Sequence, residues 1–113
     1  MIPSVSFLPS HSDAKQVEQV KVTIVGLITP HVLKVMDLAT QAETGVNVDW
    51  YLRDAVARSV DDLAHQFNAR ELLSAYIQGL QAQADEVERA RKGYAGVLQT
   101  AAAIAARKLR ELD

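Results

Sequence analysis

A short alternation of side chains between Val20 and Val25 is the first regular pattern in the chain. Its period of two and its β-branched residues predict a short strand. The segment from Asp13 to Ile28 also fits a helix, because apolar residues recur there at helical spacing. These residues are Val17, Val20, Ile24 and Leu27. A single strand leaves its backbone donors and acceptors unpaired, so the strand predicts a homodimer.

A helix is expected to begin at Thr29 and Pro30. The threonine hydroxyl can cap free amides, and proline is favoured at the first helical position, where its missing N–H has no consequence. The apolar stripe of this helix consists of Val32, Val35, Met36, Ala39 and Ala42. Gly45 then stands where a left-handed residue commonly ends a helix.

A second helix is expected from Asn47 to about Gln66. Asn47 can cap its first amides, and Asp49 lies favourably near the positive end of the helix dipole. Apolar residues follow at helical spacing, which predicts one buried face. They are Leu52, Val56, Val60, Leu63 and Phe67.

The segment after Asn68 is rich in helix-forming residues and contains no proline. Its seam of mostly apolar positions alternates steps of four and three, the heptad spacing of helices that pack along each other. The seam comprises Leu73, Ile77, Leu80, Ala84, Val87, Arg91, Tyr94, Leu98, Ala101, Ala105, Lys108 and Leu112. The pattern predicts a long helical arm, and a hairpin folded near Gly93 to Gly96 is the alternative.

These patterns divide the chain into three parts. Residues 1–19 form an N-terminal arm, residues 20–67 a strand-helix-helix core, and residues 68–113 a C-terminal helical or coiled-coil arm. The predicted fold class is mostly α, with one short N-terminal strand, two helices and the long arm. An all-α helical bundle is the alternative.

The composition narrows the classes of protein. A chain of 113 residues with 49% hydrophobic content suits one domain with a modest core. With 12 basic against 14 acidic residues, it has no overall positive field that would attract nucleic acid or anionic lipid. The absence of cysteine excludes disulfides and thiolate metal sites. We find neither a signal peptide nor about 18 consecutive apolar residues, so we expect a cytoplasmic protein without membrane contacts.

The residues around the second helix carry a family resemblance. Gly45 and Asn47 precede Leu52-Arg53-Asp54-Ala55-Val56, a run of aliphatic, basic, acidic, alanine and aliphatic residues. Together with the strand and the proline-started helix, this order resembles the ribbon-helix-helix DNA-binding superfamily of Arc-type repressors and plasmid relaxosome or partition proteins. The resemblance covers about residues 20–60.

The resemblance implies a two-stranded antiparallel ribbon, one strand per chain, in the DNA major groove. It implies that Lys21, Thr23 and Val25 contact base edges. It also implies that backbone amides at Asn47 and Val48 hold a phosphate against the helix dipole. The predicted function is therefore sequence-specific DNA binding by a homodimeric transcriptional, plasmid or phage regulator. Residues 69–112 would add a tetramer contact or a protein partner.

The charges of the core support an alternative function. The basic residues from Val20 to Phe67 are Lys21, Lys34, Arg53 and Arg58. The acidic ones are Asp37, Glu43, Asp49, Asp54, Asp61 and Asp62. Four basic against six acidic residues suit protein contacts better than phosphate neutralisation. The alternative is a non-enzymatic, all-helical structural subunit or adaptor of a larger bacterial or phage assembly.

No chemical motif accompanies these patterns. His11, His31 and His65 share no spacing typical of a metal site. The chain also has no glycine-rich phosphate loop, nucleophile elbow or paired-carboxylate motif. We therefore expect no enzymatic activity, no cofactor and no metal.

Overall fold

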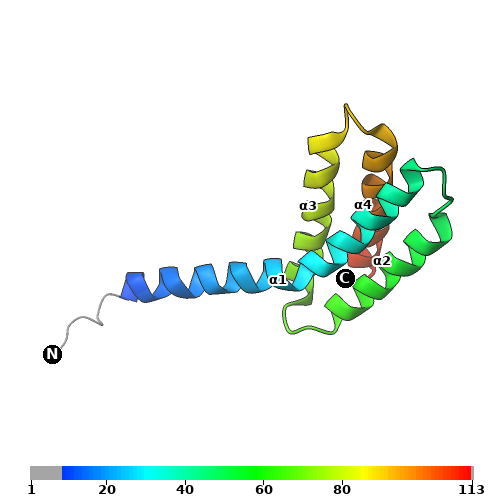
Figure 1. Ribbon diagram of the computed structural model, residues 1–113. Helices are drawn as coiled ribbons and strands as arrows, with labels where there is room; N and C mark the ends of the chain where they lie inside the picture. The colour runs from blue at the N-terminus through cyan, green and yellow to red at the C-terminus, as the bar shows by residue number, and fades with distance from the viewer. Residues whose placement is uncertain (1–8, 113) are drawn as a thin grey trace.

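The protein folds into helices only, within the part of the chain that the structure describes. The computed structural model describes the backbone of residues 9–112 and the side chains of residues 23–112. Its four helices are α1 (Pro9–Glu43), α2 (Asp49–Ala64), α3 (Ala69–Val87) and α4 (Lys92–Glu111). The second half of α1 packs with the other three helices, and the first half projects away from them (Figure 1).

The predicted strand is wrong, because Val20–Val25 lies inside α1. The helical alternative for Asp13 to Ile28 is the arrangement found, and the helix continues to Glu43. Six residues are too few to separate a period of two from a helical period when apolar residues satisfy both. The fold class of a strand with two helices is therefore wrong, and the all-α alternative fits.

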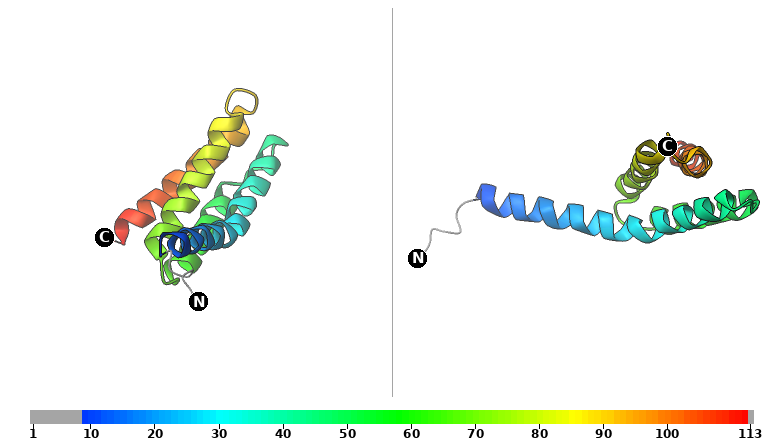
Figure 2. Two further views of the ribbon diagram at one scale, coloured as in Figure 1. Left: turned by 90° about the vertical axis from the view of Figure 1, so that its left-hand side faces the viewer. Right: turned by 45° about the horizontal axis from the view of Figure 1, so that its top comes forward.

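Pro30 does not begin a helix but lies in the interior of α1. A proline there removes the hydrogen bond to the carbonyl of Gly26, and its ring crowds that carbonyl. The hydroxyl of Thr29 donates to the Val25 carbonyl at 2.6 Å and so supplies one bond within the same turn. The direction of α1 changes between its projecting half and the half within the body (Figures 1 and 2), as expected for a helix with an internal proline.

The predicted end of this helix at Gly45 is confirmed. Gly45 has a positive φ of 96°, which favours glycine. Its N–H donates to the Ala42 carbonyl at 3.1 Å, and the Val46 N–H donates to the Gln41 carbonyl at 3.3 Å. These two bonds are the pattern of a glycine C-cap that satisfies the last carbonyls of a helix.

The C-terminal segment is not an arm, because α3 and α4 lie side by side and pack on α1 and α2 (Figure 1). The hairpin alternative is confirmed, although its turn at residues 88–91 precedes Gly93 and Gly96. Most of the seam is buried, including Leu73, Ile77, Leu80, Ala84, Tyr94, Leu98, Ala101 and Ala105. The heptad spacing was correct, but the seam of each helix packs within the same chain.

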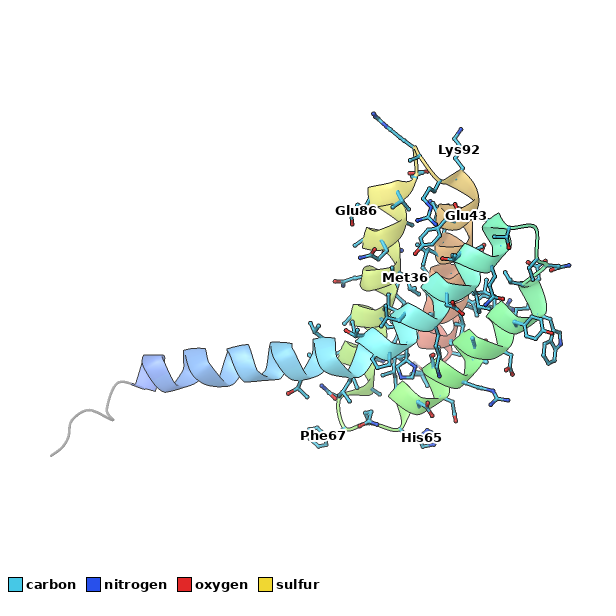
Figure 3. All side chains as sticks on the ribbon, in the orientation of Figure 1. Met36, Glu43, His65, Phe67, Glu86 and Lys92 are labelled. Atoms are coloured by element: carbon cyan, nitrogen blue, oxygen red, sulfur yellow. The ribbon has the colours of Figure 1, made fainter. Side chains whose placement is uncertain are left out.

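One cluster of buried side chains draws on all four helices. Its largest fully buried members are Tyr76, Leu63, Leu72, Leu73, Leu80, Leu98, Val35 and Val56. The stripe predicted on α2 is buried up to Leu63, whereas Phe67 lies beyond the helix end and is exposed. Phe67 points away from the helices at the α2–α3 turn (Figure 3).

The projecting half of α1 makes the molecule elongated. The structure measures 65 × 32 × 18 Å, with a radius of gyration of 17.7 Å. A compact domain of this length would have a radius of gyration of about 13 Å. The difference follows from the first part of α1, since the stretch from Pro9 to Leu27 spans about 27 Å at the rise of an α-helix.

Candidate interaction surfaces

The structure separates the residues that were predicted to contact DNA. Lys21, Thr23 and Val25 lie on α1, whereas Asn47 and Val48 lie in the connection to α2. From Val25 to the end of α1 the helix extends for about 27 Å. Thr23 and Val25 are exposed, and the side chain of Lys21 lies outside those described. Without the strand these residues form no ribbon, so DNA binding remains a prediction that lacks its structural basis.

The start of α2 is partly occupied by the protein's own groups. The Asn47 side chain accepts a hydrogen bond of 3.1 Å from the Asp49 N–H, but the N-cap of α2 is Val48, so Asn47 lies one residue before the cap position. Val48 is buried, and its carbonyl accepts the Leu52 N–H at 2.7 Å. Asp49 supplies a carboxylate at the positive end of the helix dipole. A phosphate at this position would compete with that carboxylate.

The projecting half of α1, defined here as Pro9–Leu27, extends beyond the other three helices (Figure 2). Its last residues already belong to the edge of the body, since Ile24 and Leu27 are half-buried. In the sequence, Val17 and Val20 precede them at helical spacing. An isolated helix with β-branched residues is only marginally stable in water, so this apolar face requires a surface to pack on.

A groove lies beside the base of the projecting half. It has a volume of about 390 Å³ and is lined by Ile24 of α1 and by the first turns of α3. Its α3 wall consists of Arg70, Glu71, Ser74, Ala75 and Gln78. Four of these five α3 residues are polar, so the groove joins Ile24 to a mostly polar part of the body.

One stretch of α1 has the length and composition of a membrane span, which the sequence analysis did not detect. Thr23–Glu43 is 21 residues long and contains an 18-residue window with a mean hydropathy of 1.2. Core helices share this composition, but only 17% of the window is buried against the other helices, at Ile28, Val35 and Ala39. The stretch thus has a role within the body, and the cytoplasmic location remains a prediction.

A second exposed apolar surface lies where α1 meets α2. Val46, Trp50 and Tyr51 are all exposed. The two aromatic rings contact each other edge to face, with centroids 5.6 Å apart and planes at 89°. Exposed aromatic residues are enriched in protein interfaces. The exposure of Trp50 and Tyr51 therefore makes this surface a candidate interface.

A polar cluster joins α1, α2 and α3 inside the body. His31 Nδ1 lies 2.7 Å from Ser59 Oγ, and the His31 ring contacts Tyr76 edge to face at 6.2 Å. Burial raises the pKa of Tyr76 to about 12. The Ser59 side chain opposes this rise, although the two hydroxyls do not meet the geometry of a hydrogen bond. The Tyr76 hydroxyl therefore has no hydrogen-bond partner among the described residues.

This cluster is unsuited to catalysis. A histidine beside a serine is the arrangement of a base and its nucleophile. Ser59, however, is only 1% exposed, so a substrate cannot reach its hydroxyl. The described residues also contain no group of three or more histidines or acidic residues that could hold a metal ion. We interpret the cluster as part of the packing between three helices.

Comparison of the chain with protein-family models, with curated proteins and with solved structures found no match.

Proposed function

We propose that the protein is a non-enzymatic, all-helical subunit of a larger protein assembly, in which the projecting half of α1 pairs with the same segment of a second copy. The observation that carries this proposal is the path of α1, whose first half projects beyond the other three helices while Ile24 and Leu27 at its base pack against the body. This is the alternative function suggested by the sequence. It needs neither a strand nor a basic surface.

A second copy is the partner that the segment suits best. The projecting half carries Asp13, Glu18, Lys15 and Lys21, so its net charge is zero and two copies do not repel each other. Its apolar face, from Val17 to Leu27, can pack along an identical face in the manner of a coiled coil. Pairing of this kind retains the predicted homodimer but replaces the ribbon with helices.

The test is a helix-breaking substitution within the projecting half. Val20→Pro removes an amide and disrupts the helix far from the buried core, whereas the control Val20→Ala retains it. We expect dimers of the wild type and of Val20→Ala in sedimentation equilibrium. At the low concentrations at which the wild type is a dimer, we expect monomers of Val20→Pro that still unfold cooperatively. A monomeric wild type, or a dimeric Val20→Pro variant, would contradict the proposal.

Two further measurements distinguish the competing occupants of this helix. Flotation of the wild type with phospholipid vesicles, but not of Val20→Pro, would show that the apolar face binds a membrane instead of a second copy. A mobility shift with specific duplex DNA at low and high salt would favour the regulator. Either result in a monomeric protein would overturn the pairing.

A further inference from the structure

A cleft with an apolar floor and a basic rim lies between α2 and α4. Its volume is about 460 Å³. Ala57 and Ile104 contribute apolar surface to it. Thr100 also lines it, and the Thr100 hydroxyl already donates to the Gly96 carbonyl at 2.9 Å. The uncharged residues of the cleft therefore leave few hydrogen-bonding groups that a bound molecule would have to satisfy.

The cationic side chains of the cleft are incompletely paired. Arg53 and Arg107 form no ion pair with any residue that the structure describes, and both line the cleft. The nearby carboxylates have other partners, since Asp54 lies 3.0 Å from Arg58 and Glu111 lies 3.6 Å from Lys108. The cleft thus gathers guanidinium groups from two helices, and Glu111, the acidic residue of its lining, is paired with Lys108.

The helix dipole accounts for only part of this charge. Arg107 lies near the C-terminus of α4, where the dipole favours cations. Arg53 lies in the second turn of α2, near the positive end of its helix, where a cation is unfavourable. An external carboxylate in the cleft would be attracted by both arginines. Guanidinium groups bind carboxylates in a bidentate geometry.

The complementary surface is on α3 of the same protein. Asp85 and Glu86 are exposed and form no ion pair within the described residues, and Glu86 points away from the body (Figure 3). The exposed Ala82 lies one turn earlier and allows another helix to approach closely. The face from Gln78 to Glu88 is about 15 Å long, close to the 16 Å of α4 from Thr100 to Glu111.

We propose that the α2–α4 cleft of one copy binds the acidic end of α3 of a second copy. The two surfaces differ, so the contact is head-to-tail, and it can be repeated from copy to copy into an open-ended assembly. This contact involves no residue of the projecting half of α1. It is therefore a second interface, which goes beyond the pairing of α1 and can be tested separately.

Charge reversal on each surface provides the test. The cleft variant is Arg53→Glu with Arg107→Glu, and the α3 variant is Asp85→Lys with Glu86→Lys. All four side chains are exposed, so both variants should unfold at temperatures close to that of the wild type. In sedimentation velocity, the mass of the wild type should increase with concentration beyond the dimer and decrease with added salt.

Each variant alone should associate at least about tenfold more weakly through this contact, because like charges then face each other. Mixing the two variants should restore association, because each offers the surface that the other has lost. Arg58→Glu is the matched control, since Arg58 is an exposed arginine of α2 outside the cleft. It should associate like the wild type.

Three outcomes would overturn the proposal. The first is a wild type whose mass never exceeds that of the α1-paired dimer. The second is an increase of mass with concentration that both variants retain. The third is a mixture of the two variants that associates no better than either variant alone. Failure of this contact leaves the effect of Val20→Pro on dimerisation unchanged, so the two interfaces are judged independently.

Discussion

Arg91 Nε donates a hydrogen bond of 2.9 Å to the carboxylate of Glu43, which lies 48 residues earlier in the chain. The same guanidinium lies over the ring of Tyr94, with its central carbon 4.0 Å from the ring centroid. The contact ties the end of α1 to the turn between α3 and α4. Arg91 interrupts the apolar seam because it lies at this corner and not in the core.

Glu43→Gln should make the free energy of unfolding less dependent on pH in the acidic range. The hydrogen bond from Arg91 lowers the pKa of Glu43 below its usual 4.5. The ionised carboxylate therefore adds stability above pH 4.5, and this contribution is lost as the pH falls through the lowered pKa. Urea unfolding should show a more stable wild type at neutral pH and converging curves in acid. A difference in unfolding free energy between the wild type and Glu43→Gln that persists in strong acid would contradict this role.

His31 should make the protein less stable as the pH falls through 6.5. Burial, and secondarily the charge of Lys34, lower the pKa of His31 from its usual 6.5, against an opposing effect of Asp62. The unfolded chain then binds a proton before the folded one does, so protonation favours unfolding. His31→Gln should remove this loss of stability. Thermal unfolding of the wild type and of His31→Gln at pH values above and below 6.5 provides the measurement.

His65→Gln is the matched control for that pH dependence. A hydrogen bond with the Asp61 carbonyl raises the pKa of His65, so its contribution is present at low pH and is lost as the pH rises through the raised pKa. The two histidines therefore act in opposite directions. Replacing His65 should steepen the acid loss that His31 causes, and a shallower loss would contradict the assignment.

Tyr76→Phe should leave the protein as stable as the wild type or stabilise it by up to about 1 kcal/mol. The buried hydroxyl has no hydrogen-bond partner among the described residues, so its removal relieves a desolvation penalty. Ser59→Ala should instead destabilise by about 1 kcal/mol, because it leaves the ring nitrogen of His31 unpaired. Denaturant unfolding of both variants tests the pair. A large loss for Tyr76→Phe would reveal a bond that the structure lacks.

Gly26→Ala and Gly45→Ala should change stability in opposite directions. Gly26 lies inside α1 with no atom within 4 Å of an added Cβ, so alanine should stabilise the helix by about 0.5–1 kcal/mol. Gly45 has φ +96°, where alanine is strained by about 1–3 kcal/mol. Gly26 follows directly after the predicted strand, so a stabilising alanine would also support the helix found there.

The sequence predicted best where a pattern admitted one structure. The stripe from Leu52 to Leu63 repeats over three turns, and Gly45 has a conformation that few residues share, so the α2 face and the end of α1 were correct. The segment from Val20 to Val25 fitted two periods. Pro30 was predicted to begin a helix, because proline is favoured at the first helical position. Packing of the apolar face around it keeps it inside α1 instead.

The heptad seam and the interaction surfaces show a second reason why the sequence alone did not predict the structure. Heptad spacing indicates that a helix has a partner but not whether that partner belongs to the same chain, so an arm and a hairpin gave one pattern. The cleft depends on Arg53 and Arg107, which only the packing of α2 on α4 brings together. No sequence pattern around Arg53 or Arg107 identifies either residue as part of a binding surface.

Pro30 also gives the assembly a mechanical property. The α1 segment from Pro9 to Pro30 is about 30 Å long, and the missing backbone bond makes its base the easiest place to bend. A change of about 10° at that point moves the tip by about 5 Å, and Ile28, which is buried in the body, limits the size of such a bend. The segment then works as a lever arm, so bodies joined through it can lie at a range of angles.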